Sequence, residues 1–167
     1  FVEEIKTPTY GSVSFSSSRK SPEVFYNFSS FTYPSTIFSY DSQRHISAPI
    51  HATELKDFDP AAYVTEQVFY TSKDGTKVPM FITYKKGLKK DGTNPVYLYG
   101  YGGFNITLNP GFSPSRLFWL ENGGIYAQAN LRGGAEYGDA WHEAGTKMKK
   151  QNVFDDFISA GEFMINE

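Results

Sequence analysis

The alternation of hydrophobic and polar positions divides the chain into two parts with different periodicities. Up to about residue 58, apolar and polar residues alternate over short stretches, which predicts β-strands separated by turns rich in Ser, Pro, Lys and Asp. The four predicted strands cover residues 11–18, 22–31, 35–42 and 48–55. Such a series is typical of one blade of a β-propeller or of part of a sandwich. One blade cannot bury its faces alone, so we expect the rest of such a structure to lie outside this sequence.

The second part, from about residue 64, alternates strands and helices. Its first two predicted strands, 65–72 and 76–87, flank the dipeptide Asp74-Gly75, which is a strong hairpin signal. The third, "PVYLYGYGG" at 95–103, is nearly all apolar and is predicted to be buried on both faces. A fourth strand follows at 124–134. This order predicts an α/β sheet with the hairpin as its antiparallel edge.

Two helices are predicted in this second part. The first begins at Pro114, with Ser113 as its cap, and stops at the dipeptide Asn122-Gly123. The second covers residues 152–165, and its first residue is predicted to cap it. Its first turn is predicted to hold Asp155 and Asp156, and its apolar stripe to consist of Val153, Phe154, Phe157, Ile158, Gly161, Met164 and Ile165.

Two glycine-rich loops, "YGYGGF" at 99–104 and "RGGAEYG" at 132–138, follow two of the predicted strands. Ligands of α/β sheets bind beyond the carboxyl ends of the strands, so these loops predict a site. Their glycine spacing fits neither a dinucleotide fingerprint nor a P-loop. It fits better the oxyanion loop of hydrolases, with the Tyr101 hydroxyl as donor and the Phe104 ring as an apolar wall. The alternative is a tight turn whose aromatic side chains are simply packed in the core.

Composition excludes several other classes. The chain has 167 residues, of which 40% are hydrophobic, so it can bury a sizeable core. A formal charge of −2 gives no general reason to bind nucleic acid or an anionic membrane, and two lysine clusters, within 85–90 and 147–150, are interpreted as solvated faces. With no cysteine, thiolate zinc sites, disulfides and a cysteine nucleophile are excluded. No apolar run is long enough to span a membrane, and no signal peptide is visible.

A metal site is not expected either. The segment "WHEAGT" begins like the zinc motif His-Glu-x-x-His, but Thr146 occupies the position of the second histidine. We therefore predict that His142 is a loop residue without a metal-binding role. The chain starts at Phe1 and ends in what looks like the middle of a helix, so we expect it to be a fragment.

Three motifs in order, "LYGYGGFN", "ANLRGGAEYGDAWHEAG" and "KKQNVFDDF", closely resemble the prolyl oligopeptidase family of serine peptidases. The resemblance implies an α/β-hydrolase sheet preceded by the last blade of a β-propeller, with the propeller part at 1–58 and the first part of the catalytic domain at 59–167. It gives Tyr101 the role of oxyanion-hole donor. It also makes Phe104 part of the pocket for the substrate proline.

The resemblance further implies hydrolysis of short, proline-containing peptides on the carboxyl side of proline, without metal or organic cofactor. No Gly-x-Ser-x-Gly motif is present, so the catalytic Ser, Asp and His are expected in the remaining part of the same polypeptide. We predict that the fragment alone is inactive. A cytoplasmic enzyme is expected, with the periplasm as the alternative compartment.

Two other functions stay open at this point. One is an oligopeptidase of the same family with a different residue preference before the cleaved bond. The other is a catalytically inert, hydrolase-like binding module. The sequence also suggests a structural role for Arg132, whose guanidinium is expected to pair with Asp155 or Asp156 and to fix both loops.

Overall fold

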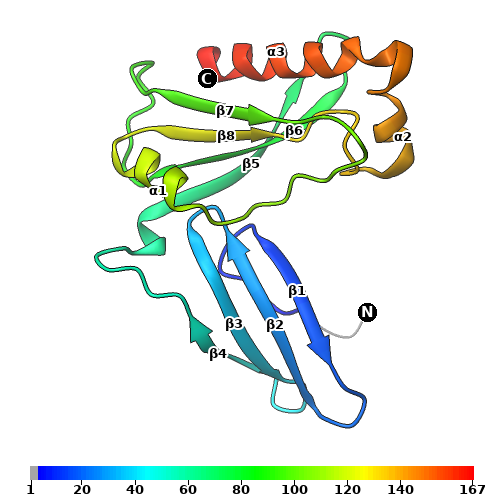
Figure 1. Cartoon of the computed structure of the whole chain (residues 1–167). Coiled ribbons are helices and arrows are strands. Elements are labelled where there is room, and N and C mark those ends of the chain that lie inside the picture. The colour runs from blue at the N-terminus through cyan, green and yellow to red at the C-terminus, as the bar shows by residue number, and fades with distance from the viewer. Residues whose placement is uncertain (1–3) are drawn as a thin grey trace. The chain divides into compact units, whose positions relative to one another are not determined.

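The computed structural model describes residues 4–167, which form two compact units (Figure 1). The first consists of the chain up to residue 62 together with 109–117, and the second of residues 63–108 and 118–167. Each unit contains one four-stranded sheet.

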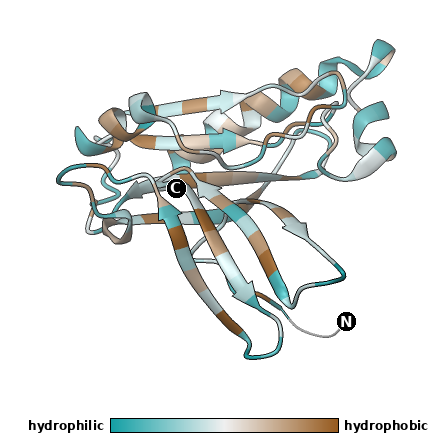
Figure 2. Cartoon of the chain, turned by 60° about the horizontal axis from the view of Figure 1, so that its bottom comes forward, coloured by the Kyte–Doolittle hydropathy of each residue, from teal (hydrophilic) through white to brown (hydrophobic). Residues whose placement is uncertain are grey.

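The first unit is an antiparallel meander in the order β1-β2-β3-β4. Its strands are β1 (Ser12–Ser17), β2 (Glu23–Ser30), β3 (Tyr33–Asp41) and β4 (Ile46–Ala52). Hydrophobic and polar positions alternate along them, as Figure 2 shows by colour. The prediction of four strands is confirmed.

The core of the first sheet lies on one face of β2 and β3. Tyr26 and Phe38 stack there with ring centroids 4.9 Å apart, and both are buried. Every residue of β4 is exposed, as is most of β1. The sheet therefore leaves much of its surface uncovered within the described residues, as expected of a single blade.

The sheet of the second unit has the order β5-β6-β8-β7. Its strands are β5 (Tyr63–Thr71), β6 (Lys77–Lys85), β7 (Val96–Gly100) and β8 (Ile125–Ala129). Strands β5 and β6 form the predicted hairpin, and its turn uses Gly75 at φ +87°. Only the pair β7–β8 is parallel. The sheet is thus mixed, with the hairpin at its antiparallel edge as predicted.

The prediction that the apolar third strand is buried on both faces is wrong. This strand, β7, lies at the edge of the sheet in the described chain, and Val96, Tyr97 and Tyr99 are exposed. The strand that is buried along its whole length is β8, which pairs with a neighbour on each side. An apolar run predicts burial, but it does not reveal which strand is central.

The helices of the second part are α1 (Pro114–Glu121), α2 (Gly138–Glu143) and α3 (Gln151–Asn166). Two 3₁₀ turns, η1 (Pro60–Ala62) and η2 (Lys147–Lys149), precede β5 and α3. Helix α1 begins and ends as predicted, and the Ser113 carbonyl accepts the first bond from the N–H of Leu117. No helix in the described part of the chain is long and apolar enough to cross a bilayer.

Helix α3 differs from its prediction in two respects. It starts before Asn152, because η2 leads directly into it, and the Asn152 amide donates to the Ala144 carbonyl instead of capping the helix. Its first turn therefore contains no acidic residue.

The predicted apolar stripe of α3 is only partly correct, since Val153 is buried and Met164 packs against the core. Phe154, Ile158 and Ile165 are more than half exposed, whereas the buried positions include Asp156 and Ala160. The buried side of the helix thus includes the carboxylate of Asp156. Hydrophobic periodicity could not predict this, because it assigns charged residues to the exposed side.

Candidate active-site loops

The two glycine-rich loops begin at the same edge of the second sheet. Strands β7 and β8 are parallel, and their last residues, Gly100 and Ala129, are paired. The chain therefore leaves both strands side by side at their carboxyl ends, where ligands of α/β sheets bind. The predicted placement of the loops is confirmed.

Glycine is required where the two loops meet. A Cβ atom on Gly102, which has φ +60°, would lie 2.4 Å from Val153 Cγ1 and 2.9 Å from the Arg132 carbonyl oxygen. A Cβ atom on Gly133, at φ +91°, would lie 2.7 Å from the Gly102 carbonyl oxygen. The glycines thus combine a left-handed backbone with close contact between the two loops.

Tyr101 and Phe104 are on the surface of the first loop. Tyr101 is 44% exposed and Phe104 is 84% exposed, and their ring centroids are 6.4 Å apart. Phe104 and the next residue, Asn105, both have positive φ, at 53° and 56°. Such a conformation is unfavourable for a bulky residue and is often associated with function. The exposure favours a binding loop over a turn padded by core aromatics.

The backbone of this loop is held by groups that the sequence analysis did not identify. The Lys150 ammonium donates to the Gly102 carbonyl at 2.7 Å, and the Asn105 N–H donates to the Gly133 carbonyl at 3.2 Å. The interpretation of the second lysine cluster as a solvated face is therefore wrong for Lys150, whose side chain is only partly exposed. The only hint in the sequence was its position within one of the family-like motifs.

The far end of the same loop is fixed at Leu108. Its N–H donates to the Glu136 carboxylate at 3.0 Å, and its carbonyl accepts bonds from Gln128 Nε2 and Asn130 Nδ2 at 3.2 and 2.9 Å. Gln128 and Asn130 are both buried. Their side chains project from β8 and the residue after it, so the sheet itself sets the course of the loop.

Arg132 forms the buried centre of an ion-pair network. Its Nη2 lies 2.6 Å from Asp156 Oδ1, and its Nη1 lies 2.6 Å from Asp74 Oδ2. The Arg132 side chain is 5% exposed, and that of Asp156 is fully buried. Of the two predicted acidic partners, Asp156 is the correct one, whereas Asp155 accepts a hydrogen bond from Gln151.

The network joins the second loop, helix α3 and the β5–β6 hairpin. Ser72 Oγ and the Arg132 backbone N–H also donate to Asp156, at 2.6 and 3.1 Å, so that carboxylate is well satisfied. The hydrogen bond from Arg132 holds the pKa of Asp74 well below its usual value. The bond to Asp156 raises the pKa of Arg132, and burial raises that of Tyr70, whose hydroxyl donates to the Asp156 carbonyl.

His142 lies on α2 and not in a loop, so that part of its prediction is wrong. Its Nδ1 is 2.7 Å from the Gly133 carbonyl oxygen, which also accepts the Asn105 N–H. The imidazole therefore contacts the junction of the two loops. Among residues 4–167 there is no cluster of His, Asp and Glu that could hold a metal ion.

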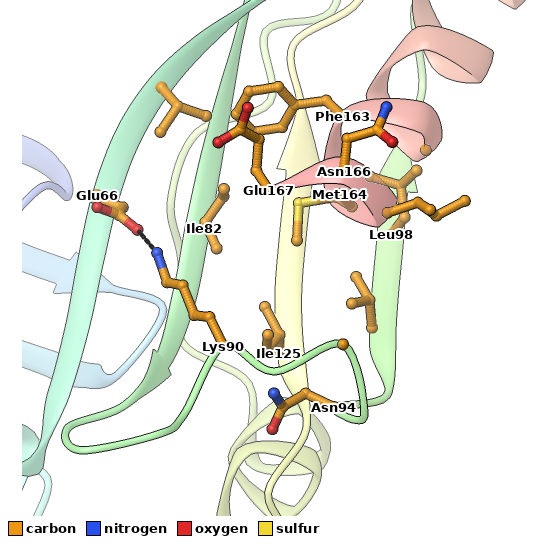
Figure 3. A pocket seen from close by; sticks show the side chains of 15 residues that line it. Glu66, Ile82, Lys90, Asn94, Leu98, Ile125, Phe163, Met164, Asn166 and Glu167 are labelled. Carbon is orange, nitrogen blue, oxygen red and sulfur yellow. Dashed lines mark hydrogen bonds and ion pairs between the residues drawn. The ribbon is translucent and has the colours of Figure 1, made fainter.

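A cavity of about 690 Å³ lies elsewhere on the second unit (Figure 3). It is lined by residues of the sheet, of the segment before β7 and of the C-terminal part of α3, among them Val96, Ile125 and Met164. Lys90 and Glu66 also line it, and they form an ion pair with Nζ and Oε1 3.2 Å apart. Val96 and Ile125 are the first residues of β7 and β8. The cavity is thus near the amino ends of the parallel strands, and neither Tyr101 nor Phe104 lines it. The glycine loops remain the better candidate site.

Comparisons with known proteins agree with this arrangement. Residues 1–53 match the family model described as prolyl oligopeptidase, N-terminal beta-propeller domain, and residues 110–167 match the prolyl oligopeptidase family. A prolyl endopeptidase of Elizabethkingia meningoseptica is 54% identical over 98% of this chain and 23% of its own length. A prolyl endopeptidase of Dictyostelium discoideum is 44% identical over the whole chain and 22% of its own length.

Solved structures give the same result. One from a structural and mechanistic analysis of two prolyl endopeptidases has a TM-score of 0.86 at 47% identity, covering 96% of this chain and 24% of that structure. The apo prolyl oligopeptidase B of Galerina marginata has a TM-score of 0.87 at 39% identity, over 96% of this chain and 24% of that structure. The chain spans about a quarter of the length of these relatives.

The first sheet is therefore part of a β-propeller, and the second belongs to an α/β-hydrolase domain. The chain belongs to the prolyl oligopeptidase family.

Proposed function

We propose that the full-length protein is a serine endopeptidase that hydrolyses short peptides on the carboxyl side of proline. In this proposal the chain supplies part of the oxyanion hole and of the pocket for the proline side chain. The propeller portion extends to about residue 58, and residues 59–167 form the first part of the catalytic domain. The observation that supports the proposal most directly is the loop 101–108, in which Tyr101 and a strained phenylalanine are exposed at the carboxyl edge of the sheet.

The chemistry of the loop fits acyl transfer. A tetrahedral intermediate places negative charge on the former carbonyl oxygen, and hydrogen-bond donors held in advance stabilise that charge most effectively. The Tyr101 hydroxyl is such a donor, on a backbone fixed at Gly102, Asn105 and Leu108. A serine nucleophile, with its histidine and aspartate, would come from the rest of the polypeptide.

The Phe104 ring offers a flat apolar surface to a pyrrolidine ring. Its exposure leaves that face available to a substrate, and its position three residues after Tyr101 places both groups on one short loop. The relatives at 54% and 44% identity carry the name prolyl endopeptidase, which supports proline as the residue before the cleaved bond.

The remaining expectations belong to this proposal. We infer that the substrates are oligopeptides, that the reaction uses neither metal nor organic cofactor, and that nucleic acid and membranes are not partners. The absence of cysteine suits a reducing compartment such as the cytoplasm.

The substitution Tyr101→Phe in the full-length enzyme tests the proposal directly. Loss of one oxyanion donor is expected to lower kcat by a factor on the order of 10² to 10³, with little change in KM. Steady-state kinetics on a fluorogenic Gly-Pro peptide measure both constants. Tyr99→Phe is the matched control, because it removes a hydroxyl from the exposed strand just before the loop.

Three results would refute the assignment. A change confined to KM would mean that Tyr101 binds substrate without stabilising the oxyanion. Faster cleavage after Arg or Lys than after Pro would favour an oligopeptidase of the family with another preference, and no cleavage of any peptide would favour an inert binding module.

A further inference from the structure

The charge at the start of helix α3 is unfavourable for the helix. Lys150 occupies its N-cap position, and Lys147 and Lys149 lie in the preceding 3₁₀ turn. Helix N-termini favour Ser, Thr, Asp or Asn at the cap and disfavour positive charge, because the helix dipole is positive there. The Lys150 side chain also makes no capping hydrogen bond. Its identity is therefore not explained by the helix that it begins.

The Lys150 ammonium is directed to the first glycine loop instead. It donates to the Gly102 carbonyl at 2.7 Å and lies 5.9 Å from the centre of the Phe154 ring. A charge-assisted bond of this length is among the stronger hydrogen bonds in proteins. The cation–π contact helps to hold the ammonium in place.

This bond acts on the peptide unit of the loop that joins two glycines. The Gly102–Gly103 peptide lies between two glycines, which lack the side chains that restrict φ and ψ in other residues. A Cβ atom on Gly103 would lie 3.8 Å from Lys150 Nζ and 3.9 Å from Tyr101 Cε1. The ammonium and the tyrosine ring thus flank the same glycine. Rotation of this peptide would change the position of Tyr101 relative to Phe104.

We propose that Lys150 is a positioning residue for the reaction, in which its ammonium holds the Gly102–Gly103 peptide so that Tyr101 meets the oxyanion while Phe104 meets the proline ring. This inference rests on the proposed function. It assigns to Lys150 no contact with substrate. Its effect passes through the backbone to Tyr101.

The substitution Lys150→Asn in the full-length enzyme separates this role from a structural one. Asparagine removes the positive charge from the start of the helix, which offsets part of the lost bond to the Gly102 carbonyl, so the melting temperature is expected to change little. Misplacement of Tyr101 is expected to lower kcat by about 10- to 100-fold, with a smaller change in KM. Lys150→Arg keeps a charged donor and is expected to retain more of the rate.

Lys149→Asn is the matched control, since this neighbouring lysine is exposed. It removes the same charge from the start of α3 and is expected to leave kcat unchanged. A double variant gives the sharpest result. In the Tyr101→Phe background, Lys150→Asn should cause no further loss of kcat, because the hydroxyl that it positions is already absent.

The outcomes separate the positioning role of Lys150 from the proposed function of the protein. If Tyr101→Phe slows the enzyme but Lys150→Asn does not, the positioning role is overturned and the proposed function stands. If Lys150→Asn lowers kcat and the melting temperature together, and does so equally in the Tyr101→Phe background, Lys150 has only a structural role. If Tyr101→Phe itself leaves kcat unchanged, the proposed function fails first, and the positioning role fails with it.

Discussion

Phe104 combines an exposed aromatic ring with a left-handed backbone. The ring is 84% exposed, and φ is +53°. Such a backbone costs a non-glycine residue about 1–2 kcal/mol, and an exposed ring recovers little of that through packing. The residue is therefore unfavourable for stability alone, which supports its proposed role in binding.

The variant Phe104→Gly should separate stability from binding. Glycine relieves the left-handed strain but makes the unfolded chain more flexible, and these effects nearly cancel. The variant would remove the proposed apolar contact with proline, and KM is expected to rise by roughly 10- to 100-fold, from the ~1.5–3 kcal/mol that burial of such a side chain contributes. Kinetics on a Gly-Pro peptide and thermal unfolding measure both quantities.

Phe118→Ala provides the comparison for this variant, because Phe118 is also exposed but lies on α1. It should leave KM unchanged. An unaltered KM in Phe104→Gly would exclude the ring from the proline pocket.

At the scale of elements, Arg132 connects three segments that are far apart in sequence. The β5–β6 hairpin contributes Asp74, helix α3 contributes Asp156, and the second glycine loop contributes the arginine itself. A planar guanidinium can serve both carboxylates at once, whereas an ammonium cannot reproduce this geometry. The network therefore fixes the second loop from two directions.

Replacing Arg132 by Lys should destabilise the second unit even though the charge is kept. Buried acceptors on Asp156 would lose their partners, which costs about 1–3 kcal/mol. Thermal unfolding of the full-length protein should show a lower melting temperature. Arg44→Lys, in the exposed pair with Asp41, is the neutral control, and an unchanged melting temperature in Arg132→Lys would contradict the structural role.

Asp74 should make the free energy of unfolding depend on pH. Arg132 lowers the pKa of Asp74 in the folded protein. The contribution of the Asp74 carboxylate to the free energy of unfolding is therefore fully present above the ordinary carboxyl pKa of about 4. It is lost as the pH falls below that value. The urea midpoint of Asp74→Asn should be lower than that of the parent at pH 7, and the gap should narrow at pH 3. Since Asp74 is partly exposed, the effect is modest.

Asp139→Asn, which changes an exposed acid on α2, serves as the reference for the Asp74 experiment. It should shift the midpoint little at either pH. A gap between parent and Asp74→Asn that stays constant from pH 7 to pH 3 would show that the carboxylate charge is not what Arg132 stabilises.

Much of the fold could be predicted because its signals are local. The hairpin follows from Asp74-Gly75, and helix α1 follows from Pro114 and the Asn122-Gly123 stop. The exposure of β7 could not be predicted, because strand order depends on pairing between distant segments. The start of α3 was missed because a 3₁₀ turn of lysines, which is a poor helix start by charge, leads into it.

The site was predictable to a different degree. Gly102 and Gly133 were recognisable as parts of glycine-rich loops at strand ends, and an acidic partner for Arg132 was expected. Lys150 and Glu136 were not, because their hydrogen bonds go to backbone groups 48 and 28 positions away. Every residue has the same backbone groups, so a side chain that bonds to the backbone has no partner that the sequence could identify.

On the scale of the whole molecule, the chain covers about a quarter of the relatives that it matches. We predict that residues 1–167 alone neither cleave Gly-Pro peptides nor react with a fluorophosphonate probe, because no nucleophile elbow is present. The full-length protein should do both. Intact mass measurement after labelling checks the prediction, and labelling of the isolated chain would disprove it.

The edge position of β7 has a practical consequence for that experiment. Its outer side presents backbone donors and acceptors without a neighbouring strand in the described chain, and exposed apolar residues, including Val96, Tyr97 and Tyr99, accompany them. An open edge of this kind recruits other strands and promotes aggregation. The isolated chain should therefore self-associate at the concentrations used for purification, and a soluble fusion partner should reduce this self-association.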